Sequence, residues 1–411
     1  MPGNRWSPIC PPPRGLVRPV PVDPTGSRGP TRSQARGRRW RQTSHGFYVP
    51  AAVDADRPEQ RVLEQSVRLP AGGAVTGWAA CRLAGATFFD GLAADGRTPS
   101  PVPLVVGRRA RIRGDDRVAL SRDRLAAEEV VLRHGVPCAR ELRSLFDAMR
   151  TAPGVRAAVV AMDMMAAAEL VSIRQMAAYV LDHAGWTGVE RVRRALRLAS
   201  EESRSPKESE MRLIWVLDAG LPPPRCNRPV FDGGGRLIGY PDLLDVEAGV
   251  VGEYDGADHR GALRHSKDVA REEDFRRAGL EYFKVTGPDL GSPRRVVERM
   301  RFTRSRARWL PAAERRWTIE PPPGWFRSPL ESMSLDDLLA YRAGPSRPLT
   351  GGMTASVRSK MVTERAQEQP YCSEPAAAAG RELDSSGASG PSRGGAGVSR
   401  WRRGPVPGTG R

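Results

Sequence analysis

Residues 239–260 decide how the fold and function of this chain are interpreted, and they have the sequence GYPDLLDVEAGVVGEYDGADHR. The pattern predicts short strands there, and in or beside them lie four carboxylates: Asp242, Asp245, Glu253 and Asp255. Aspartate is depleted in ordinary strands, so these acids either cap turns or hold a metal ion. Side chains two residues apart on a strand face the same way, which places Glu253 and Asp255 on one face.

The segments around this stretch predict helices and strands in the order α-β-β-β-α-β-α. The first helix is expected from Ser205 to Gly220, because Ser205, Pro206 and Glu208 form a capping-box-like start. The expected strands are two over residues 228–245 joined by a glycine turn, one over 250–256 and one over 281–286, and the further helices cover 264–280 and 292–310.

This order of elements can bring several acids together. A neighbouring strand can carry Asp242 to Glu253 and Asp255, and Glu208 can approach from the first helix. Three or four carboxylates at one point repel each other unless a cation is present, and oxygen-rich sites of this type favour Mg²⁺ or a similar ion such as Mn²⁺. Such an ion polarises a phosphodiester and lowers the pKa of a bound water. The residues therefore predict metal-assisted hydrolysis of a phosphate ester.

Four motifs between residues 205 and 290 carry a family resemblance: SPKESEMR, GYPDLLD, GEYDGADHR and KDVAREEDFRRAGLEYFKVTGPDL. In this order they resemble the C-terminal domain of unknown function related to very-short-patch-repair endonucleases, within the PD-(D/E)XK superfamily. The resemblance implies a restriction-endonuclease-like α/β domain with an αβββαβ core that acts on DNA. It implies that Asp242 and Glu253 are the metal ligands, with the carbonyl of Tyr254 as a further ligand. Glu208 would be the acid of the helix, paired with Arg212.

The chain departs from the superfamily motif at one position. The motif ends in a lysine that positions the water, and here that position is Asp255. His259 is the expected substitute, as general base or as the group that orients the water with Asp255. Lys267 or Lys284 can also reach the site from a neighbouring element.

Each of these residues has a simpler interpretation, and two other functions stay open. Asp242 can be a polar residue at a strand end, Asp255 part of an Asp-Gly turn, Glu208 a helix cap, His259 a bystander, and Asp245 a turn residue. The alternative to a Mg²⁺-dependent endodeoxyribonuclease is a non-catalytic nucleic-acid-binding or antitoxin-like regulatory protein that retains the nuclease fold. A metal-dependent phosphoesterase acting on RNA or nucleotides is a third possibility.

The domain organisation follows from composition and pattern. Residues 43–202 predict a mixed α+β front domain, and 203–310 form the nuclease-like domain, followed by an extension over 311–344. The front domain loosely resembles the antitoxin of type IV abortive-infection systems, on motifs such as GWAACRLAG and HGVPCARELRSLFDAM. Residues 1–42 and 345–411 are rich in Pro, Gly, Ser and Arg without apolar periodicity, so both are expected to be disordered tails.

The positive charge lies mostly in the two terminal segments, and the hydropathy gives no sign of a membrane helix. The net charge is +18, but residues 1–42 hold nine arginines against one acid and residues 345–411 ten basic residues against five acids, so about +5 remains in between. No run of 18 apolar residues occurs, which predicts that no helix spans a membrane. The five cysteines are far apart, without a CxxC pair, which is typical of a cytoplasmic protein without disulfides or zinc.

Overall fold

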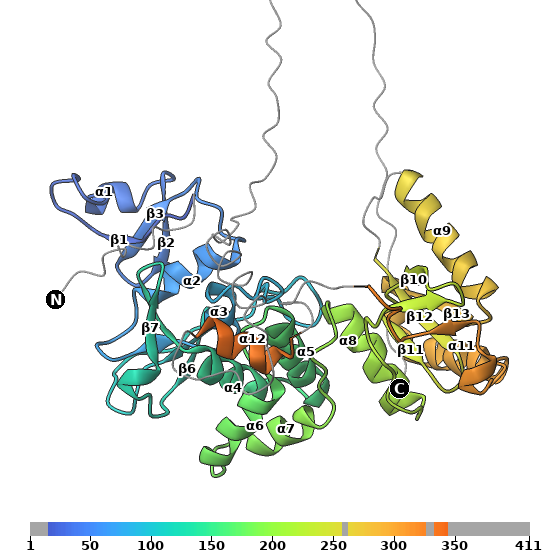
Figure 1. Cartoon of the computed structure of the whole chain (residues 1–411). Coiled ribbons are helices and arrows are strands. Elements are labelled where there is room, and N and C mark those ends of the chain that lie inside the picture. Colours follow the sequence, from blue (N-terminus) through green and yellow to red (C-terminus); the bar gives the residue numbers. More distant parts are fainter. Residues whose placement is uncertain (1–14, 257–261, 326–332, 344–411) are drawn as a thin grey trace, which may run out of the picture. The chain divides into compact units, whose positions relative to one another are not determined.

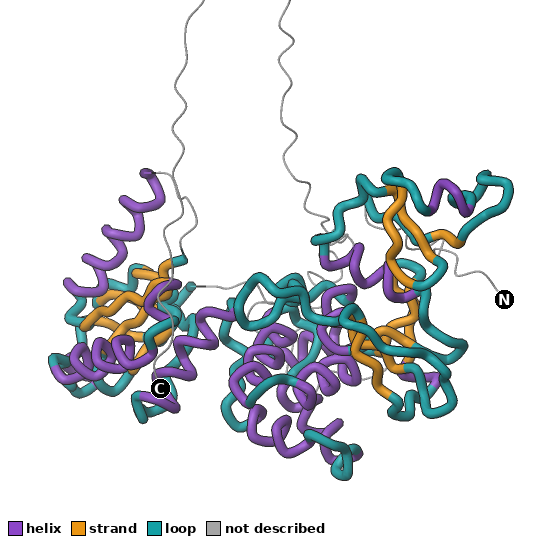
Figure 2. The backbone as a smooth tube through the Cα atoms, turned by 180° about the vertical axis from the view of Figure 1, so that it is seen from behind, coloured by secondary structure: helices purple, strands orange, loops and turns teal. Residues whose placement is uncertain are grey.

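The computed structural model describes residues 15–256, 262–325 and 333–343. These residues belong to the first of two compact units, Met1–Met353, and the second unit, Thr354–Arg411, lies outside the described residues, as does the expected tail over 345–411. The described chain mixes helices with several small sheets (Figures 1 and 2). The α+β character predicted from the sequence is therefore present.

The chain is ordered earlier than the sequence predicts. A three-stranded sheet, in the order β1-β3-β2, opens the described part together with a short helix. Its elements are β1 (Val20–Pro21), α1 (Arg32–Ala35), β2 (Trp40–Ser44) and β3 (Phe47–Pro50). The expectation of a disordered segment over residues 1–42 is wrong for residues 15–42. Strand pairing and a turn in which Asp23 accepts hydrogen bonds from the N–H groups of Thr25 and Arg28 order this segment, and neither produces apolar periodicity.

A five-stranded sheet in the order β6-β5-β4-β8-β7 follows, covered by two helices. Its elements are α2 (Pro58–Ser66), β4 (Ala74–Val75), α3 (Gly77–Leu83), β5 (Val102–Val105), β6 (Val118–Ser121), β7 (Val130–Arg133) and β8 (Val136–Ala139). Leu63 of α2, Ala79 of α3 and Leu104 of β5 share one apolar core.

Four helices then form a second core. They are α4 (Glu141–Thr151), α5 (Val155–Ala167), α6 (Ile173–Asp182) and α7 (Val189–Leu196). Met162 and Met165 are fully buried in this core, where their flexible side chains fill space between helices. Leu213, from the next helix, belongs to the same core.

The C-terminal part contains the elements around the carboxylates. They are α8 (Pro206–Leu213), a π-helical turn η2 (Ile214–Asp218), β9 (Val230–Asp232), β10 (Leu237–Gly239), β11 (Leu243–Asp245), β12 (Val250–Asp255), α9 (Ala262–Arg277), β13 (Glu281–Thr286), α10 (Gly287–Leu290), α11 (Pro293–Ser305), β14 (Trp317–Thr318) and α12 (Leu335–Arg342). The second strand expected over residues 228–245 is interrupted, because β10 and β11 belong to different sheets on either side of Pro241. Proline cannot donate to a ladder, so a strand breaks there readily.

Two sheets result in this part, ordered β11-β12-β13 and β10-β9-β14. In the first, β11 runs antiparallel to β12, while β12 and β13 are parallel and are connected through α9. Phe275 of α9 belongs to the same apolar core as Val251, and Met300 of α11 belongs to the same core as Val250, the neighbouring residue that faces the opposite way. Helices α9 and α11 therefore cover opposite faces of this sheet.

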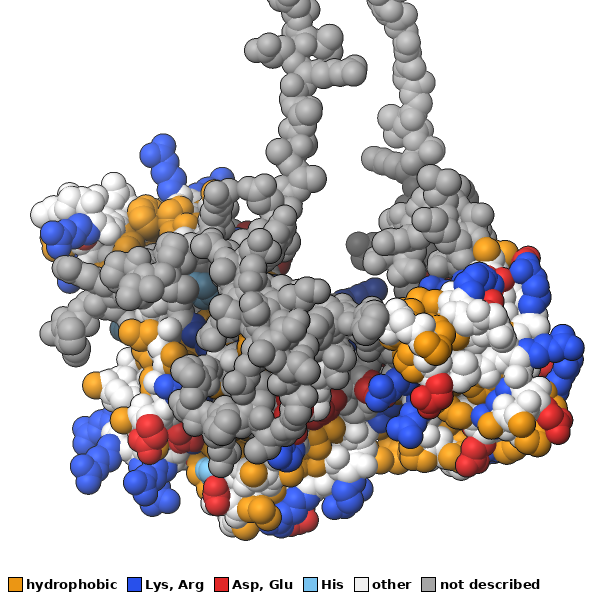
Figure 3. Space-filling view, in the orientation of Figure 1, with side chains coloured by type: hydrophobic (Ala, Val, Ile, Leu, Met, Phe, Trp, Pro, Cys, Tyr) orange, Lys and Arg blue, Asp and Glu red, His pale blue; other side chains and the backbone are white. Residues whose placement is uncertain are grey.

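Helix α9 carries charges of both signs, whereas α11 carries five arginines and one glutamate. In Figure 3, Lys and Arg side chains in the region of α9 and α11 lie among Asp and Glu side chains. On α9, Arg276 pairs with Glu272 at 3.0 Å and Arg277 with Glu273 at 2.7 Å. Within the described ranges, no helix is long and apolar enough to cross a membrane.

Candidate functional site

The register of the sheet β11-β12-β13 positions the carboxylates. Leu243 lies opposite Gly252 in the antiparallel pair, so one further step of the same register sets Asp242 opposite Glu253. The N–H of Tyr254 donates to Oδ2 of Asp242 at 2.7 Å, which fixes the Asp242 carboxylate against β12. The strand pairing thus brings Asp242 and Glu253 together, as the sequence predicts.

A third carboxylate, Glu208, approaches from α8. Its charge acts on Asp242: burial first, and then the negative charge of Glu208, raise the pKa of Asp242 to about 7. The hydrogen bond from Tyr254 lowers this pKa, and the charge of Glu253 raises it further. The charges of Glu208 and Glu253 thus both act on Asp242, and we call these three acids the carboxylate cluster.

Hydrogen bonds from the surrounding chain hold Glu208 in place. The side chain of Ser205 accepts from the N–H of Glu208 at 3.2 Å, so the expected N-cap is present. The return bond of a capping box goes one residue further back, since Oε2 of Glu208 accepts from the N–H of Arg204 at 2.9 Å. The same oxygen accepts from Nδ2 of Asn227 at 2.9 Å. One oxygen of Glu208 is thereby held at the N-terminal end of α8, between the backbone of Arg204 and the side chain of Asn227.

Two side chains hold Glu253, which is buried. Its Oε2 accepts from the hydroxyl of Tyr282 on β13 and from Nη2 of Arg271 on α9, each at 2.9 Å. In the part of the chain that the structure describes, hydrogen bonds to the carboxylate cluster all go to one oxygen of each acid. The other oxygens, Oε1 of Glu208, Oδ1 of Asp242 and Oε1 of Glu253, remain as acceptors.

Lys284 lies beside Asp255, the residue at which the sequence departs from the predicted motif. It lies opposite Glu253 in the parallel β12–β13 pair, and Asp255 is on the same face. Its Nζ lies 3.5 Å from Oδ2 of Asp255, and both side chains are partly exposed. A basic group therefore enters the site from the neighbouring strand.

Other expected residues lie outside the described residues or in different surroundings. His259 falls within residues 257–261, outside the described ranges, and the side chain of Lys267 is also outside them. Asp245 accepts from the N–H groups of Glu247 and Ala248, each at 3.1 Å, so it caps the turn after β11.

The expected pairing of Arg212 with Glu208 is wrong. Nη2 of Arg212 bonds Oδ2 of Asp163 on α5 at 2.7 Å, and the hydroxyl of Ser209 donates to the same oxygen at 2.7 Å. Asp163 is fully buried, so it is the stronger partner for a guanidinium that is itself nearly buried. This ion pair attaches α8 to α5 and leaves Glu208 available to the carboxylate cluster.

Sequence reasoning missed Tyr282 and Asn227. Tyr282 and Lys284 alternate along β13, so both face the same way as Glu253, and that period of two was a usable signal. Asn227 has a positive φ of 51°, a backbone conformation in which Asn is enriched, but its distance of 19 residues from Glu208 gives no local pattern.

The carboxylates of this site can bind a hard cation that needs few protein ligands. No group of three or more His, Cys, Asp or Glu side chains gathers at metal-ligand spacing among residues 15–256, 262–325 and 333–343. Mg²⁺ commonly needs only one or two carboxylates, and takes its other ligands from water and substrate phosphates. Asp242 and Glu253 fit this requirement, because they face each other across the strand pair and each keeps one oxygen.

Comparisons with protein-family models, with curated proteins and with solved structures found no match. The resemblance to very-short-patch-repair-like domains therefore stays a prediction carried by the motifs.

Proposed function

We propose that this protein is a divalent-metal-dependent endonuclease that hydrolyses DNA phosphodiester bonds. The observation that carries the proposal is the carboxylate cluster, in which Asp242 has its pKa raised to about 7. A carboxyl group with such a pKa, in a site that collects acids, is typical of a functional site. A bound cation would favour the ionised carboxylate and so oppose the burial and the repulsion that raise this pKa.

Asp242 and Glu253 would hold the metal. The ion, when bound, would polarise the phosphoryl oxygens and acidify a water. Arg271 and Tyr282 orient Glu253 by occupying its Oε2, and the N–H of Tyr254 orients Asp242 in the same manner. Such contacts from neighbouring groups fix the direction of metal ligands and strengthen the binding of the metal.

Lys284 supplies the positive charge that the sequence motif lacks. Its Nζ, near Asp255, can hold the attacking water by hydrogen bonds and stabilise negative charge that develops on the phosphate. Asp255 keeps the ammonium at this end of β13 through their 3.5 Å contact. In this proposal Asp255 with Lys284 performs the task expected of Asp255 with His259.

The arrangement of the C-terminal elements supports a restriction-endonuclease-like domain. Helix α8 precedes an antiparallel pair, β11 and β12, and α9 then connects β12 to the parallel strand β13. This agrees with the end of the αβββαβ order, and the β10-β9-β14 sheet is an addition to it. The acids lie on α8, on β12 and at the residue before β11, and this supports the roles that the resemblance predicts for them.

The proposal is tested by cleavage with the full chain. Supercoiled plasmid, linear duplex DNA and single-stranded RNA are incubated with Mg²⁺, Mn²⁺ or EDTA, and with wild type, Asp242→Asn, Glu253→Gln and Glu247→Gln. Glu247 is an exposed acid on the turn between β11 and β12, so its variant is the matched control. We expect metal-dependent DNA nicking that is lost with Asp242→Asn and Glu253→Gln and kept with Glu247→Gln. Cleavage in EDTA, or cleavage that survives both variants, would contradict the proposal.

One observation favours the alternative, a nucleic-acid-binding or regulatory protein without turnover. Arg271 pairs with Glu253 at 2.9 Å and so supplies part of the positive charge that a metal would bring. The same experiment distinguishes the two functions. A chain that retards DNA in a gel but cleaves no substrate with either metal would be the binding protein.

A further inference from the structure

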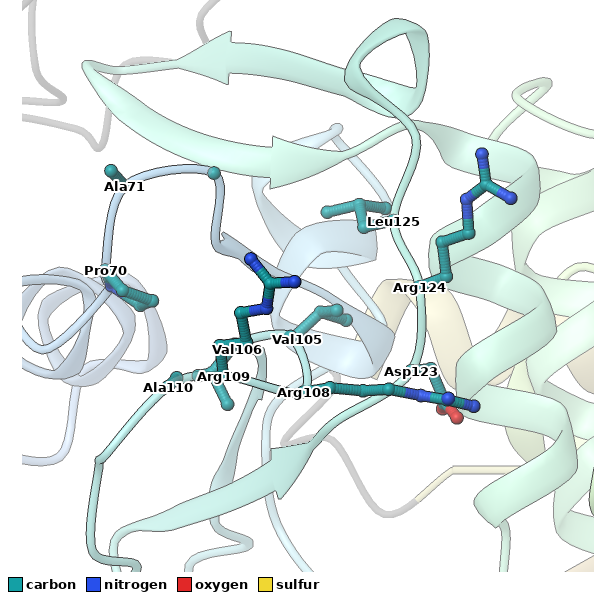
Figure 4. Close-up of a pocket in the computed structure, with 12 residues that line it drawn as sticks. Pro70, Ala71, Val105, Val106, Arg108, Arg109, Ala110, Asp123, Arg124 and Leu125 are labelled. Carbon is teal, nitrogen blue, oxygen red and sulfur yellow. The ribbon is translucent and has the colours of Figure 1, made fainter.

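A cavity of about 860 Å³ lies in the front part of the chain, away from the carboxylate cluster. Three segments form it: residues 70–72 after α2, residues 105–110 at the end of β5, and residues 123–125 after β6 (Figure 4). Its volume is within the range of about 300–1,000 Å³ that is common for small-molecule sites. The cavity is a second candidate site with its own chemistry.

Three arginines give this cavity a positive charge. Arg108, Arg109 and Arg124 line it and are exposed. Within the described part of the chain, their side chains form no ion pair or hydrogen bond. Figure 4 shows the guanidinium of Arg109 between the loop of Pro70 and Ala71 and the segment of Leu125. In the same view Arg108 extends toward Asp123 and Arg124 extends away from Arg109. Arg109 is therefore the arginine best placed for a ligand between these walls.

Asp123, the acid among the lining residues, is already engaged by the protein. It accepts a hydrogen bond from the hydroxyl of Ser121 at 2.6 Å and forms an ion pair with Arg150 of α4. Burial acts to raise the pKa of Asp123, but these two contacts outweigh it and hold the pKa below the ordinary value. Asp123 is therefore ionised and paired, and it leaves the three arginines for an anion.

Hydrogen bonds from two arginines hold the walls in position. Nη1 of Arg122 donates to the carbonyl of Ala110 at 2.7 Å, which joins the loop after β5 to the segment after β6. Nη1 of Arg143, a nearly fully buried residue of α4, donates to the carbonyl of Arg124 at 2.8 Å. The backbone that carries the arginines is thus anchored before any ligand binds, which lowers the entropy cost of binding.

The remaining lining is apolar. Pro70, Val105, Val106 and Leu125 supply it, from the same three segments as the arginines. A ligand that matches both parts needs an anionic group with several oxygens and a flat or apolar body. Arginine suits a phosphate because its planar donors match the phosphate oxygens.

We propose that this cavity binds a nucleoside phosphate, with the phosphate on Arg109, the base against the apolar wall, and Arg108 and Arg124 adding positive charge at the edges of the cavity. The nucleoside phosphate is either a free nucleotide or the 5′-phosphorylated end of a strand. The inference does not depend on the proposed nuclease activity, because none of the lining residues belongs to the carboxylate cluster.

The test is calorimetric titration of the full-length chain carrying Asp242→Asn, in EDTA and at low salt, so that no strand is cut. The probes are AMP, adenosine, inorganic phosphate, and hexathymidylate with and without a 5′-phosphate. The variants are Arg109→Ala and Arg108→Ala/Arg109→Ala. Arg194→Ala, which removes an exposed arginine from α7, is the charge-matched control. Because all three positions are exposed, the variants should fold, and thermal unfolding checks this.

We expect AMP to bind at least about tenfold more tightly than adenosine or inorganic phosphate, and Arg109→Ala to weaken AMP about tenfold or more. The double variant should weaken AMP binding further, and Arg194→Ala should leave AMP binding unchanged. If phosphorylated hexathymidylate binds more tightly than AMP, the natural ligand is the 5′-phosphorylated end of a strand. If AMP binds more tightly, the natural ligand is a free nucleotide. The inference is overturned if neither phosphorylated probe binds, if adenosine or inorganic phosphate binds as tightly as AMP, or if the arginine variants bind as wild type does.

Discussion

The ionisation of Asp242 gives the carboxylate cluster a measurable effect on folding. Its pKa rises from 3.8 to about 7 in the folded chain, chiefly through burial and then through Glu208. Between these values the folded state binds more protons than the unfolded state, so the contribution of Asp242 to stability decreases as the pH rises from about 4 to about 7. The full difference corresponds to about 4 kcal/mol in the free energy of unfolding.

The substitution Asp242→Asn removes the charge and keeps an acceptor for the N–H of Tyr254. The free energy of unfolding is measured by urea titration at several pH values for wild type, Asp242→Asn and the control Glu247→Gln. On going from about pH 4 to about pH 8, we expect Asp242→Asn to gain up to about 4 kcal/mol relative to wild type. Glu247→Gln, at an exposed position, should follow wild type throughout.

Magnesium should stabilise the folded chain by binding to the negative charge of Asp242. Binding to the folded state alone stabilises it by about 2.7 kcal/mol at a concentration one hundred times the dissociation constant. At about pH 8 we therefore expect Mg²⁺ to stabilise wild type and to have little effect on Asp242→Asn. The reasoning would be refuted if the difference between the two chains did not change with pH, or if Mg²⁺ stabilised both equally.

Three further substitutions test other parts of the account. Lys284→Met should reduce plasmid nicking about 10²–10³-fold while the thermal unfolding temperature stays within a few degrees; unchanged nicking would remove this lysine from the mechanism. Asp163→Ala leaves the buried guanidinium on α8 without its ion pair and should cost about 3–5 kcal/mol in urea unfolding, and a loss below about 1 kcal/mol would show that the pair is not needed. In Gly252→Ala the new Cβ would meet the ring of Phe283 at 2.3 Å, so a loss of about 1–3 kcal/mol is expected. Gly185→Ala has nothing within 4 Å and should show no such loss.

Several elements of the C-terminal part could be predicted because they have local signals, whereas α10, β14 and α12 were not predicted. Ser205 marks the start of α8, Gly279 follows α9, and apolar runs mark β12 and β13. The break at Pro241 could not be placed by these signals alone. β10 leaves the expected strand to pair with β9, which also pairs with β14 about 85 residues further along the chain.

The acids of the candidate site could be predicted from the sequence, whereas the residues that hydrogen-bond to them were missed. Asp242 and Glu253 stand in motifs, whereas Asn227 and Tyr282 are ordinary residues whose role depends on the distance between strands and helices. The partner of Arg212 illustrates the same limit. A helix spacing of four residues favours Glu208, but the tertiary structure supplies the buried Asp163 at 2.7 Å.

The N-terminal segment shows that composition can mislead at the scale of a few residues. Residues 15–42 have the Pro, Gly and Arg content of a disordered tail, yet Val20 pairs with Tyr48, and Gln60 bonds the backbone of Val17 through both its oxygen and its nitrogen. Such contacts are made with residues far along the chain, and a local pattern does not contain them.

The most direct test of the central claim compares the nicking of supercoiled plasmid by full-length wild type and by Asp242→Asn, with Mg²⁺ and with EDTA. The account predicts nicking by wild type in Mg²⁺, none in EDTA, and a loss of at least about 100-fold in the variant. Equal nicking by the two chains, or no nicking by wild type with Mg²⁺ or Mn²⁺, would contradict a metal-dependent nuclease built on the carboxylate cluster.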